Sequence, residues 1–289
     1  MSKKSRYNQI LGINRRNIDF IYEYNERKHY KMADDKLVSK ELLEKQGFPT
    51  PRLIKAYRYF FELKNIAQDL YGQSGFVMKP AKGKGGSGIL IIDEFTNGKW
   101  ITSSGEKYSK ERLSQHASSI LSGVYSLDNM DDALLIEEKI QLDDLLKKIS
   151  YKGIPDIRVI VFKKTPVMAM MRIPSKRSKG KANLHAGGIG VGIDIGSGIT
   201  FIAPGLSSSF GTHPDTGVIL TGLQLPYWSE IMEISQKIQE VVPLHYLGID
   251  FVIDQRYGPQ ILELNVRPGL EIQNINGKGL YRELEKIGG

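Results

Sequence analysis

Two short apolar segments near the carboxyl-terminal end constrain the fold of this chain more than any other feature. Residues 247–253 and 260–264 are separated by a polar turn, a pattern typical of a β-hairpin. Glu263 and Asn265 are two residues apart and therefore face the same side of their strand, and Asp250 on the adjoining strand can meet them across the ladder. Because the neighbouring residues are strongly apolar, we expect these polar side chains to line a cleft.

The three polar residues of this hairpin have the chemistry of a magnesium site. Mg²⁺ takes carboxylate and amide oxygens and completes its shell with phosphate and water oxygens. Sites of phosphoryl transfer use this arrangement because the metal offsets charge on the phosphate. We therefore predict that Asp250, Glu263 and Asn265 bind metal; the alternative is the polar outer face of an ordinary hairpin.

A second motif is a glycine-rich loop between two predicted strands. Residues 76–80 form the first strand, which carries Lys79 near its end, residues 82–88 form the loop, and residues 89–92 form the next strand. The loop differs from a P-loop and from the dinucleotide fingerprint because a strand follows it where those motifs have a helix. Glycine lets backbone N–H groups approach phosphate oxygens, so the pattern predicts a flap over a nucleotide; the alternative is a flexible hairpin.

A third motif begins with the apolar residues 134–136, which we interpret as a buried strand that ends at Glu137 and Glu138. Such a strand end can present backbone groups and a carboxylate to adenine. Asp143 and Asp144 follow and can reach a ribose. Acidic residues at a strand end are more often simply solvated, so the motif has little weight in isolation.

Three arginines and a long loop form the fourth motif. Arginine binds carboxylates and phosphates through two parallel hydrogen bonds and stays charged in a cleft, which makes Arg158, Arg172 and Arg267 candidates for the chemistry. The loop, residues 174–198, contains seven glycines, and loops of this length are functional or disordered. His185 lies in it; a lone histidine of this kind is ordinarily a core or surface residue.

The remaining pattern mixes helices with strands and predicts an α+β chain. Asp34 or Asp35 is the expected N-cap of one helix. We expect an N-terminal arm (residues 1–33), a small lid-like subdomain (34–135) and a larger sheet-based subdomain (136–289). Further predicted elements are helices at 59–70, 109–121 and 228–241, and an antiparallel pair of strands at 156–162 and 166–173.

Composition limits the possible functions. The 289 residues include no cysteine, which excludes disulfides, thiolate zinc sites and a cysteine nucleophile. Forty basic and 32 acidic residues give a formal net charge of +8, which favours anionic partners. The sequence has neither an apolar stretch long enough to cross a membrane nor a secretory signal. We therefore expect a cytoplasmic protein without a membrane partner.

Taken in order, these motifs resemble those of the ATP-grasp ligases, over residues 33–272. The resemblance is strongest to the α-L-glutamate ligase branch, and especially to shorter homologues related to the ribosomal-protein glutamate ligases. It rests on the Asp-Lys helix start, the lysine strand with its glycine flap, the Glu-Glu hinge, Asp-Ile-Arg, Asn-Leu-His-x-Gly-Gly and the Asp, Glu and Asn of the final hairpin. It implies an ATP-grasp fold in which two α+β subdomains clasp ATP.

The resemblance also implies roles for individual residues. The final hairpin would bind two Mg²⁺, with Mn²⁺ as a possible substitute. Arg158 and Arg172 would steady the carboxylate and the acyl phosphate, and Asn183 and His185 would line the acceptor side. The nucleotide would be held by residues of the helix start, flap and hinge, which are Lys36, Lys79, Lys82, Gly85, Gly86, Ser87, Glu137, Glu138, Lys139, Ile140 and one of Asp143 and Asp144.

Two departures from the family pattern bear on the substrates. Only about 33 residues precede the Asp-Lys helix, so we expect part of the usual substrate wall to be absent or supplied by a partner subunit or a second copy. Ala186 stands where the ribosomal-protein ligases have arginine, and Arg267 stands where they have a small residue. The acceptor therefore need not be an acidic protein tail.

The predicted reaction is the joining of a carboxylate to an amine through an acyl phosphate, with glutamate or another amino acid added to an amino acid, peptide or small molecule. One alternative is a kinase of the same fold that phosphorylates a hydroxyl. The other is a basic nucleic-acid-binding protein without catalysis, suggested by the aromatic and charged stretches 22–24 and 57–59. Nucleic acid is not the expected partner, because we interpret those stretches as core or helix positions.

Overall fold

The computed structural model describes residues 9–83, 85–126, 130–203 and 211–288. By its contacts the chain divides into two units, and we treat each separately. The first unit comprises Met1–Asp34, Leu42–Thr50 and Gln141–Gly289, and the second comprises Asp35–Glu41 and Pro51–Ile140. The domain bounds predicted from the sequence stay a prediction; in the structure, helix α4 (Lys36–Lys45) contributes residues to both units.

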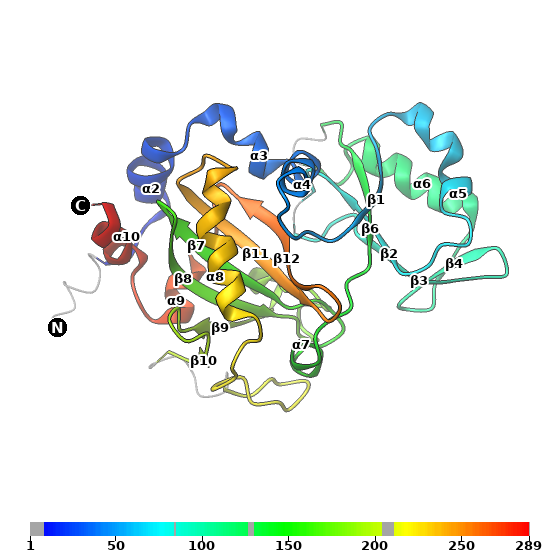
Figure 1. Ribbon diagram of the computed structural model, residues 1–289. Helices are drawn as coiled ribbons and strands as arrows, with labels where there is room; N and C mark the ends of the chain where they lie inside the picture. Colours follow the sequence, from blue (N-terminus) through cyan, green and yellow to red (C-terminus); the bar gives the residue numbers. More distant parts are fainter. Residues whose placement is uncertain (1–8, 84, 127–129, 204–210, 289) are drawn as a thin grey trace. The chain divides into compact units, whose positions relative to one another are not determined.

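The first unit is built on a six-stranded antiparallel sheet, which Figure 1 shows in green and orange. The strands in spatial order are β10 (Thr200–Phe201), β9 (Ile189–Ile193), β8 (Thr165–Ile173), β7 (Asp156–Phe162), β11 (Tyr246–Asp254) and β12 (Gly258–Asn265). Every residue of β7 and of β11 is buried, as expected for central strands. Both predicted hairpins, β7–β8 and β11–β12, are confirmed.

Helices pack on this sheet and extend from its ends. Among them, α8, α9 and α10 contact strands β7, β8 and β9. The helices of this unit are α2 (Ile13–Arg16), η1 (Asn17–Tyr22), η2 (Arg27–His29), α3 (Lys31–Asp34), α7 (Asp144–Ile149), η5 (Leu184–Ala186), α8 (Trp228–Lys237), η7 (Ile238–Glu240), α9 (Glu271–Asn276) and α10 (Leu280–Gly288). The N-terminal segment joins the core through Phe20, whose ring packs edge-on against Phe162 at 5.5 Å.

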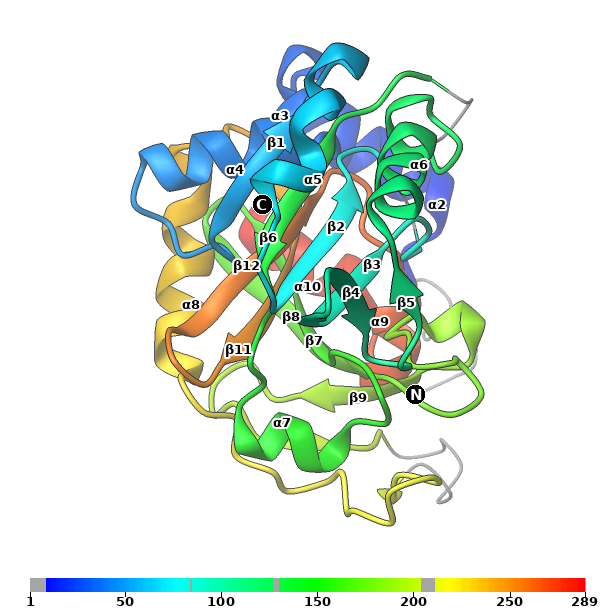
Figure 2. The ribbon, with the colours of Figure 1, turned by 90° about the vertical axis from the view of Figure 1, so that its right-hand side faces the viewer.

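The second unit has its own six-stranded antiparallel sheet, seen face-on in Figure 2. The strands in spatial order are β1 (Leu53–Tyr57), β6 (Leu134–Glu138), β2 (Phe76–Pro80), β3 (Leu90–Thr96), β4 (Lys99–Thr102) and β5 (Lys107–Tyr108). Helices η3 (Phe60–Asn65), α5 (Ile66–Asp69) and α6 (Lys110–Leu121) complete it. Its core centres on Phe76, Met78, Trp100, Leu113 and Ile136.

Local sequence signals explain the helix starts that were predicted. Asp35 caps α4, since its Oδ1 accepts hydrogen bonds from the backbone N–H groups of Leu37 at 3.0 Å and Val38 at 3.2 Å. Ser109 caps α6 by accepting from the N–H of Arg112. No helix in the described ranges is both long and apolar enough to cross a membrane.

Two predicted elements differ from the structure, and helix α7 was not predicted. The helix expected at 59–70 is a 3₁₀ helix followed by one α-helical turn. The loop expected at 174–198 contains strand β9. Glycines at positions 190 and 192 stand where a strand usually has side chains, so the sequence did not show the alternation of polar and apolar residues that is typical of a strand. A side chain at Gly190 would meet Ile275, and one at Gly192 would meet Phe201, so packing selects glycine there. Helix α7 begins directly after Asp143, in a stretch assigned to nucleotide binding.

Candidate active site

The register of the first sheet brings charged residues from three neighbouring strands onto one face. Arg158 on β7 lies opposite Asp250 on β11, and Asp250 lies opposite Glu263 on β12. Side chains at directly opposed positions share a face of the sheet. One step further along, Asp156 on β7 lies opposite Arg172 on β8. The hairpin therefore has the strand register expected from its sequence.

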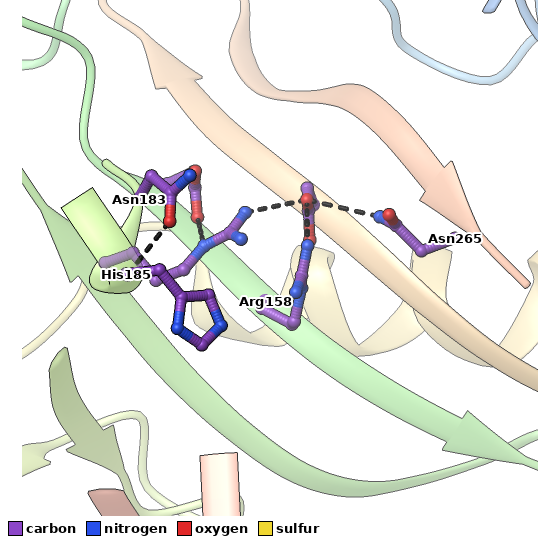
Figure 3. A network of polar contacts seen from close by, with 7 residues as sticks. Arg158, Asn183, His185 and Asn265 are labelled. Atoms are coloured by element: carbon purple, nitrogen blue, oxygen red, sulfur yellow. Dashed lines mark hydrogen bonds and ion pairs between the residues drawn. The ribbon is translucent and has the colours of Figure 1, made fainter. Parts of the chain in front are cut away.

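Asp250 is the centre of this network, shown in Figure 3. Its Oδ1 accepts from Arg158 Nε at 2.7 Å, and its Oδ2 accepts from Arg158 Nη2 at 2.6 Å and from Arg172 Nη2 at 2.7 Å. The residue is only 3% exposed. Burial alone would raise the pKa of Asp250, but the two guanidinium groups outweigh it and hold that pKa well below its usual range. Asp250 is therefore a permanent anion at neutral pH.

Asp156 is the second buried carboxylate of this face. Its Oδ1 accepts from Arg172 Nε at 2.5 Å. Burial and the nearby charge of Asp250 raise the pKa of Asp156 to about 7, against the opposing effect of Arg172. The same two carboxylates raise the pKa of Arg172 in spite of its burial. Two carboxylates thus share two arginines, with Arg172 joining them.

The donor set of the hairpin fits a hard divalent cation. Asn265 donates its Nδ2–H to Asp250 Oδ2 at 3.2 Å, which leaves the amide oxygen of Asn265 for another partner. Within the described residues, Oδ1 of Asp250 accepts only from Arg158, so one of its lone pairs remains for a cation. No group of three His, Cys, Asp or Glu suited to a metal occurs in the described ranges. The candidate site therefore depends on two carboxylates and one amide, all of them oxygen ligands.

The residues assigned to the acceptor side lie close to this network. Asn183 caps the short helix η5, because its Oδ1 accepts from the backbone N–H of His185 at 3.0 Å. His185 is exposed. Figure 3 shows these two residues on one side of the network and Asn265 on the other. Their placement agrees with an acceptor role without testing it.

Arg267 contacts residues of the N-terminal segment. Its guanidinium stacks 4.9 Å from the ring centre of Tyr30, and its Nη1 lies 3.6 Å from Asp34 Oδ2. These partners belong to the N-terminal segment. The structure therefore gives Arg267 a contact with the arm, and its proposed part in the chemistry stays a prediction.

The second unit contains a different buried network around Glu137. Lys79 Nζ lies 2.6 Å from Glu137 Oε2, and Lys40 Nζ lies 2.9 Å from Glu137 Oε1. Burial would raise the pKa of Glu137, but the two lysines outweigh it and lower that pKa. Glu137 was one of the residues expected to hold the nucleotide. Its side chain is buried between the two lysines, and alternate residues of β6 face opposite sides of the sheet. The part of Glu137 in nucleotide binding stays a prediction.

The glycine flap is fixed at its first residues. The backbone N–H of Lys82 donates to both oxygens of Asp132, at 3.0 and 3.1 Å, and Lys82 Nζ donates to the carbonyl of Asp131 at 2.7 Å. Lys36 Nζ donates to the carbonyl of Gly83 at 2.9 Å. Gly85 and Gly86 have positive φ, which glycine adopts readily, and with Ser87 they are exposed. Residue 84 of the predicted flap lies outside the described residues.

The hinge residues Glu138 and Lys139 form hydrogen bonds with side chains and backbone of the second unit. Arg52 Nε donates to Glu138 at 3.0 Å, and Lys139 Nζ donates to Asp93 at 2.6 Å. The backbone N–H of Lys139 donates to the carbonyl of Gly75 at 2.8 Å, so this group is already paired. Ile140, the last residue of the second unit, is half-buried.

The pair assigned to the ribose lies at a helix start. Oδ1 of Asp143 accepts from the N–H of Leu145 at 2.9 Å and so caps α7, whose first residue is Asp144. The capping role explains the type of residue at position 143 without a ribose, and the ribose assignment stays a prediction for both aspartates.

Three residues were given no individual role from the sequence alone, although Asp156 belongs to the Asp-Ile-Arg motif quoted there. Asp132 organises the flap base, Asp156 shares Arg172 with Asp250, and Lys40 shares Glu137 with Lys79. Spacing could have found two of them. Asp156 and Arg158 are two apart on one strand, and Lys36 and Lys40 are four apart on one helix. Asp132 carries no comparable signal.

Comparison with known proteins identifies the family. The model of the sugar-transfer associated ATP-grasp family matches residues 15–289. The chain belongs to this family. Its two antiparallel sheets with their helices form the ATP-grasp fold expected from the resemblance. No curated protein matches the chain.

Several solved structures are similar at low sequence identity. The ATP-grasp ligase PsnB complexed with minimal precursor is 13% identical with a TM-score of 0.47, over 92% of this chain and 63% of PsnB. The D-cycloserine synthetase DcsG is 12% identical with a TM-score of 0.49, over 89% and 70%. The D-alanine–D-alanine ligase from Bacillus anthracis complexed with ATP is 15% identical with a TM-score of 0.45, over 90% and 63%. The chain thus spans less than two thirds of PsnB.

Proposed function

We propose that this chain is an ATP- and Mg²⁺-dependent ligase that joins a carboxylate to an amine through an acyl phosphate. One observation carries the proposal. In a member of an ATP-grasp family, Asp250, Glu263 and Asn265 lie on one sheet face beside Arg158 and Arg172. This face combines oxygen ligands for a cation with arginines that can hold an anion.

The proposed reaction has two steps that balance. A substrate carboxylate oxygen forms a bond to the γ-phosphorus of ATP, and the bond from that phosphorus to ADP breaks. An amine nitrogen then attacks the acyl carbon, inorganic phosphate leaves with the former carboxylate oxygen, and the amine gives up a proton. Positioning and charge stabilisation are the protein's contribution.

In the first unit, Asp250, Glu263 and Asn265 are the proposed ligands of Mg²⁺. When bound, the ion would offset negative charge on the transferring phosphate. Arg158 and Arg172 keep Asp250 ionised and oriented, since together they donate three hydrogen bonds to it. In the second unit, Lys79 and the flap at Gly85 and Gly86 are the proposed phosphate contacts, with Lys36 fixing the flap at Gly83.

Glutamate or another amino acid stays our proposed acid, as the sequence resemblance implies. The family description, sugar-transfer associated, widens the choice of substrates to sugar acids and amino sugars. The same description favours a second candidate function. A sugar carries hydroxyl groups, and a kinase of this fold would transfer the γ-phosphate to one of them.

The fate of the γ-phosphate separates these candidates. The purified chain is incubated with Mg²⁺ and γ-labelled ATP across amino acids, short peptides, uronic acids and amino sugars. A ligase releases free phosphate together with ADP and yields a product whose mass equals the acid plus the amine minus water. A kinase leaves the label on the product. If no mixture forms ADP above the rate without substrates, the proposed function is wrong.

Glu263→Gln is the sharpest test of the metal assignment. The substitution removes one proposed ligand charge, while the bonds from Arg158 and Arg172 to Asp250 stay in place. We expect kcat to fall about 100-fold or more and its Mg²⁺ dependence to move to higher concentration, because Glu263 would hold the ion that offsets charge on the reacting phosphate, and losing such charge stabilisation costs roughly this much. A matched control is Glu240→Gln, an exposed acid of the same unit. Unchanged Mg²⁺ dependence in Glu263→Gln would contradict the assignment.

A further inference from the structure

A loop of the first unit concentrates positive charge. Lys176, Arg177, Lys179 and Lys181 lie within six residues and are all exposed. We call residues 174–188, which connect β8 to β9, the basic loop. Within the described residues none of these four side chains forms an ion pair. Charge runs of this kind are usually solvated, so their function depends on how the loop is held.

Hydrogen bonds of two buried serines hold the backbone of the basic loop in place. Ser175 and Ser178 are 2% and 3% exposed. The backbone N–H of Ser175 donates to Ser178 Oγ at 2.9 Å, and the N–H of Ser178 donates to Ser175 Oγ at 3.1 Å. Ser175 Oγ donates to the carbonyl of Gly187 at 2.7 Å. These bonds close the two ends of the loop on each other.

A buried histidine and its neighbour Asp215 hold the first residues of the basic loop in place. His213 is fully buried, and its Nδ1 accepts from the N–H groups of Asp215 at 3.1 Å and Thr216 at 3.2 Å. Its Nε2 must therefore carry the proton that it shares with the carbonyl of Pro174 at 2.9 Å. The carboxylate of Asp215 accepts the backbone N–H of Lys176 at 2.7 Å, so it fixes the loop backbone.

Close backbone packing leaves the loop little freedom. A Cβ added to Gly153 would lie 1.9 Å from the carbonyl oxygen of Gly180, and one added to Gly187 would lie 2.6 Å from Cγ of Arg177. Arg177 thus packs along the turn that carries Asn183 and His185. Because Arg172 on β8 pairs with Gly190 just beyond this turn, the loop adjoins the charged sheet face.

Four like charges held on a fixed loop repel one another, and an anion would remove that repulsion. The arginines of the sheet face are already engaged with Asp250 and Asp156, so a second anion needs other cations. We propose that the basic loop binds a phosphate group on the substrate that this enzyme uses besides ATP. The inference rests on the proposed function and names its substrate class: a phosphorylated molecule, for which a sugar phosphate is one candidate in a family described as sugar-transfer associated.

Phosphate suits the loop better than a lone carboxylate. Three lysines act as point charges around a group of more than one negative charge, and Arg177 can add a two-pronged contact. A single carboxylate would be satisfied by one arginine and would leave three lysines without a counterion.

Inorganic pyrophosphate is a suitable probe, because it carries the charge without requiring the identity of the substrate. Its affinity for the full chain is measured by calorimetry without ATP or Mg²⁺ at low salt. The loop variant is K176Q/K179Q/K181Q, which keeps side-chain length and removes three charges. The control variant is K28Q/K164Q/K237Q, which removes three exposed lysines of the same unit that each pair with a glutamate. Lys79→Gln reports binding at the nucleotide phosphates, and thermal melting confirms that each variant is folded.

We expect the loop variant to weaken pyrophosphate binding about tenfold or more, since phosphate affinity follows the number of cations that contact it. The control variant should change it less than about twofold by the same reasoning, and any loss in Lys79→Gln measures the share of pyrophosphate that binds at the nucleotide site. The proposal is overturned if the unaltered protein does not bind pyrophosphate, if the control weakens binding as much as the loop variant, or if Lys79→Gln abolishes binding that the loop variant retains. None of these measurements involves turnover, so failure of the ligase assay is a separate result.

Discussion

The two sheets each bury a network of charges, and the networks differ in their cations. In the first unit, Arg158 and Arg172 donate directed guanidinium hydrogen bonds to two carboxylates. In the second unit, Lys40 and Lys79 both contact one carboxylate, Glu137. A guanidinium holds a carboxylate through a planar fork, whereas a lysine ammonium is a compact point charge with three rotatable donors.

The difference teaches which ligand each unit is prepared for. The ammonium of Lys79 has three donors, so it can contact a phosphate oxygen of a nucleotide while it keeps its contact with Glu137. Glu263 at the edge of the first network adds a negative charge beside Asp250, which favours a cation. The proposed division of ATP phosphates and Mg²⁺ between lysines and carboxylates thus has an electrostatic basis in each unit by itself.

Breaking the second network should have the largest effect. Glu137→Gln removes the charge of the buried carboxylate that contacts both Lys40 and Lys79, and we expect the free energy of unfolding of the second unit to fall by about 3–5 kcal/mol, the usual cost of removing one partner of a buried ion pair. Denaturant melting measures it. Glu41→Gln, which removes an exposed partner of Arg58 in the same unit, should cost less than about 1 kcal/mol. Equal losses in the two variants would show that the burial of Glu137 does not matter.

A change of pH tests the charge network of the first unit, because it titrates Asp156. Because Asp156 has a folded pKa of about 7, above the value of about 3.9 in an unfolded chain, the folded state binds more protons between these pH values. Stability contributed by Asp156 is therefore fully present below about pH 4 and is lost as pH rises towards 7. Asp156→Asn cannot ionise and should lack this decline.

The measurement is the difference in unfolding free energy between Asp156→Asn and the unaltered protein from pH 4 to 8, without ligands. We expect the variant to gain about 3–4 kcal/mol relative to the unaltered protein across this range, because a shift of one pKa unit corresponds to about 1.4 kcal/mol. A constant difference would mean that Arg172 keeps Asp156 ionised throughout.

The smallest effect on the free energy of unfolding should come from a substitution at the ion pair between Arg52 and the hinge residue Glu138. Arg52 is paired with Glu138, but its side chain is 72% exposed. Arg52→Gln should change the free energy of unfolding by less than about 0.5 kcal/mol, because solvent screens exposed pairs. The same melting experiment measures it. A loss comparable with that of Glu137→Gln would remove the distinction between buried and exposed networks.

Period and turn signals predicted most of the framework. Alternating apolar residues gave β7, β8, β11 and β12, and Asp35 and Ser109 marked helix starts. Strand β9 was missed because tertiary packing selects its glycines. Helix α7 was missed because one acid can serve as a cap or as a ligand, and the sequence does not distinguish them.

The sequence predicted which residues form the candidate site in the last hairpin. It did not predict the long-range contacts of Glu137 and Arg267. Spacing put Glu263 and Asn265 on one face, and the register agrees. Burial of Glu137 between lysines depends on β6 pairing with β1 and β2, a long-range property that no local pattern contains. The same holds for Arg267, whose partners lie in the N-terminal segment.

The turn between β7 and β8 has a practical consequence for protein engineering. Lys163 and Lys164 both adopt positive φ, at 44° and 63°, a conformation in which asparagine and glycine are less strained than lysine. Lysine nevertheless has contacts here, since Lys163 Nζ lies 4.7 Å from the ring centre of Tyr24 and Lys164 Nζ donates to Glu240. An Asn-Gly turn would relieve backbone strain at the far end of the hairpin that carries Arg158 and Arg172, and it would remove these two lysine contacts without changing any residue of the charged face.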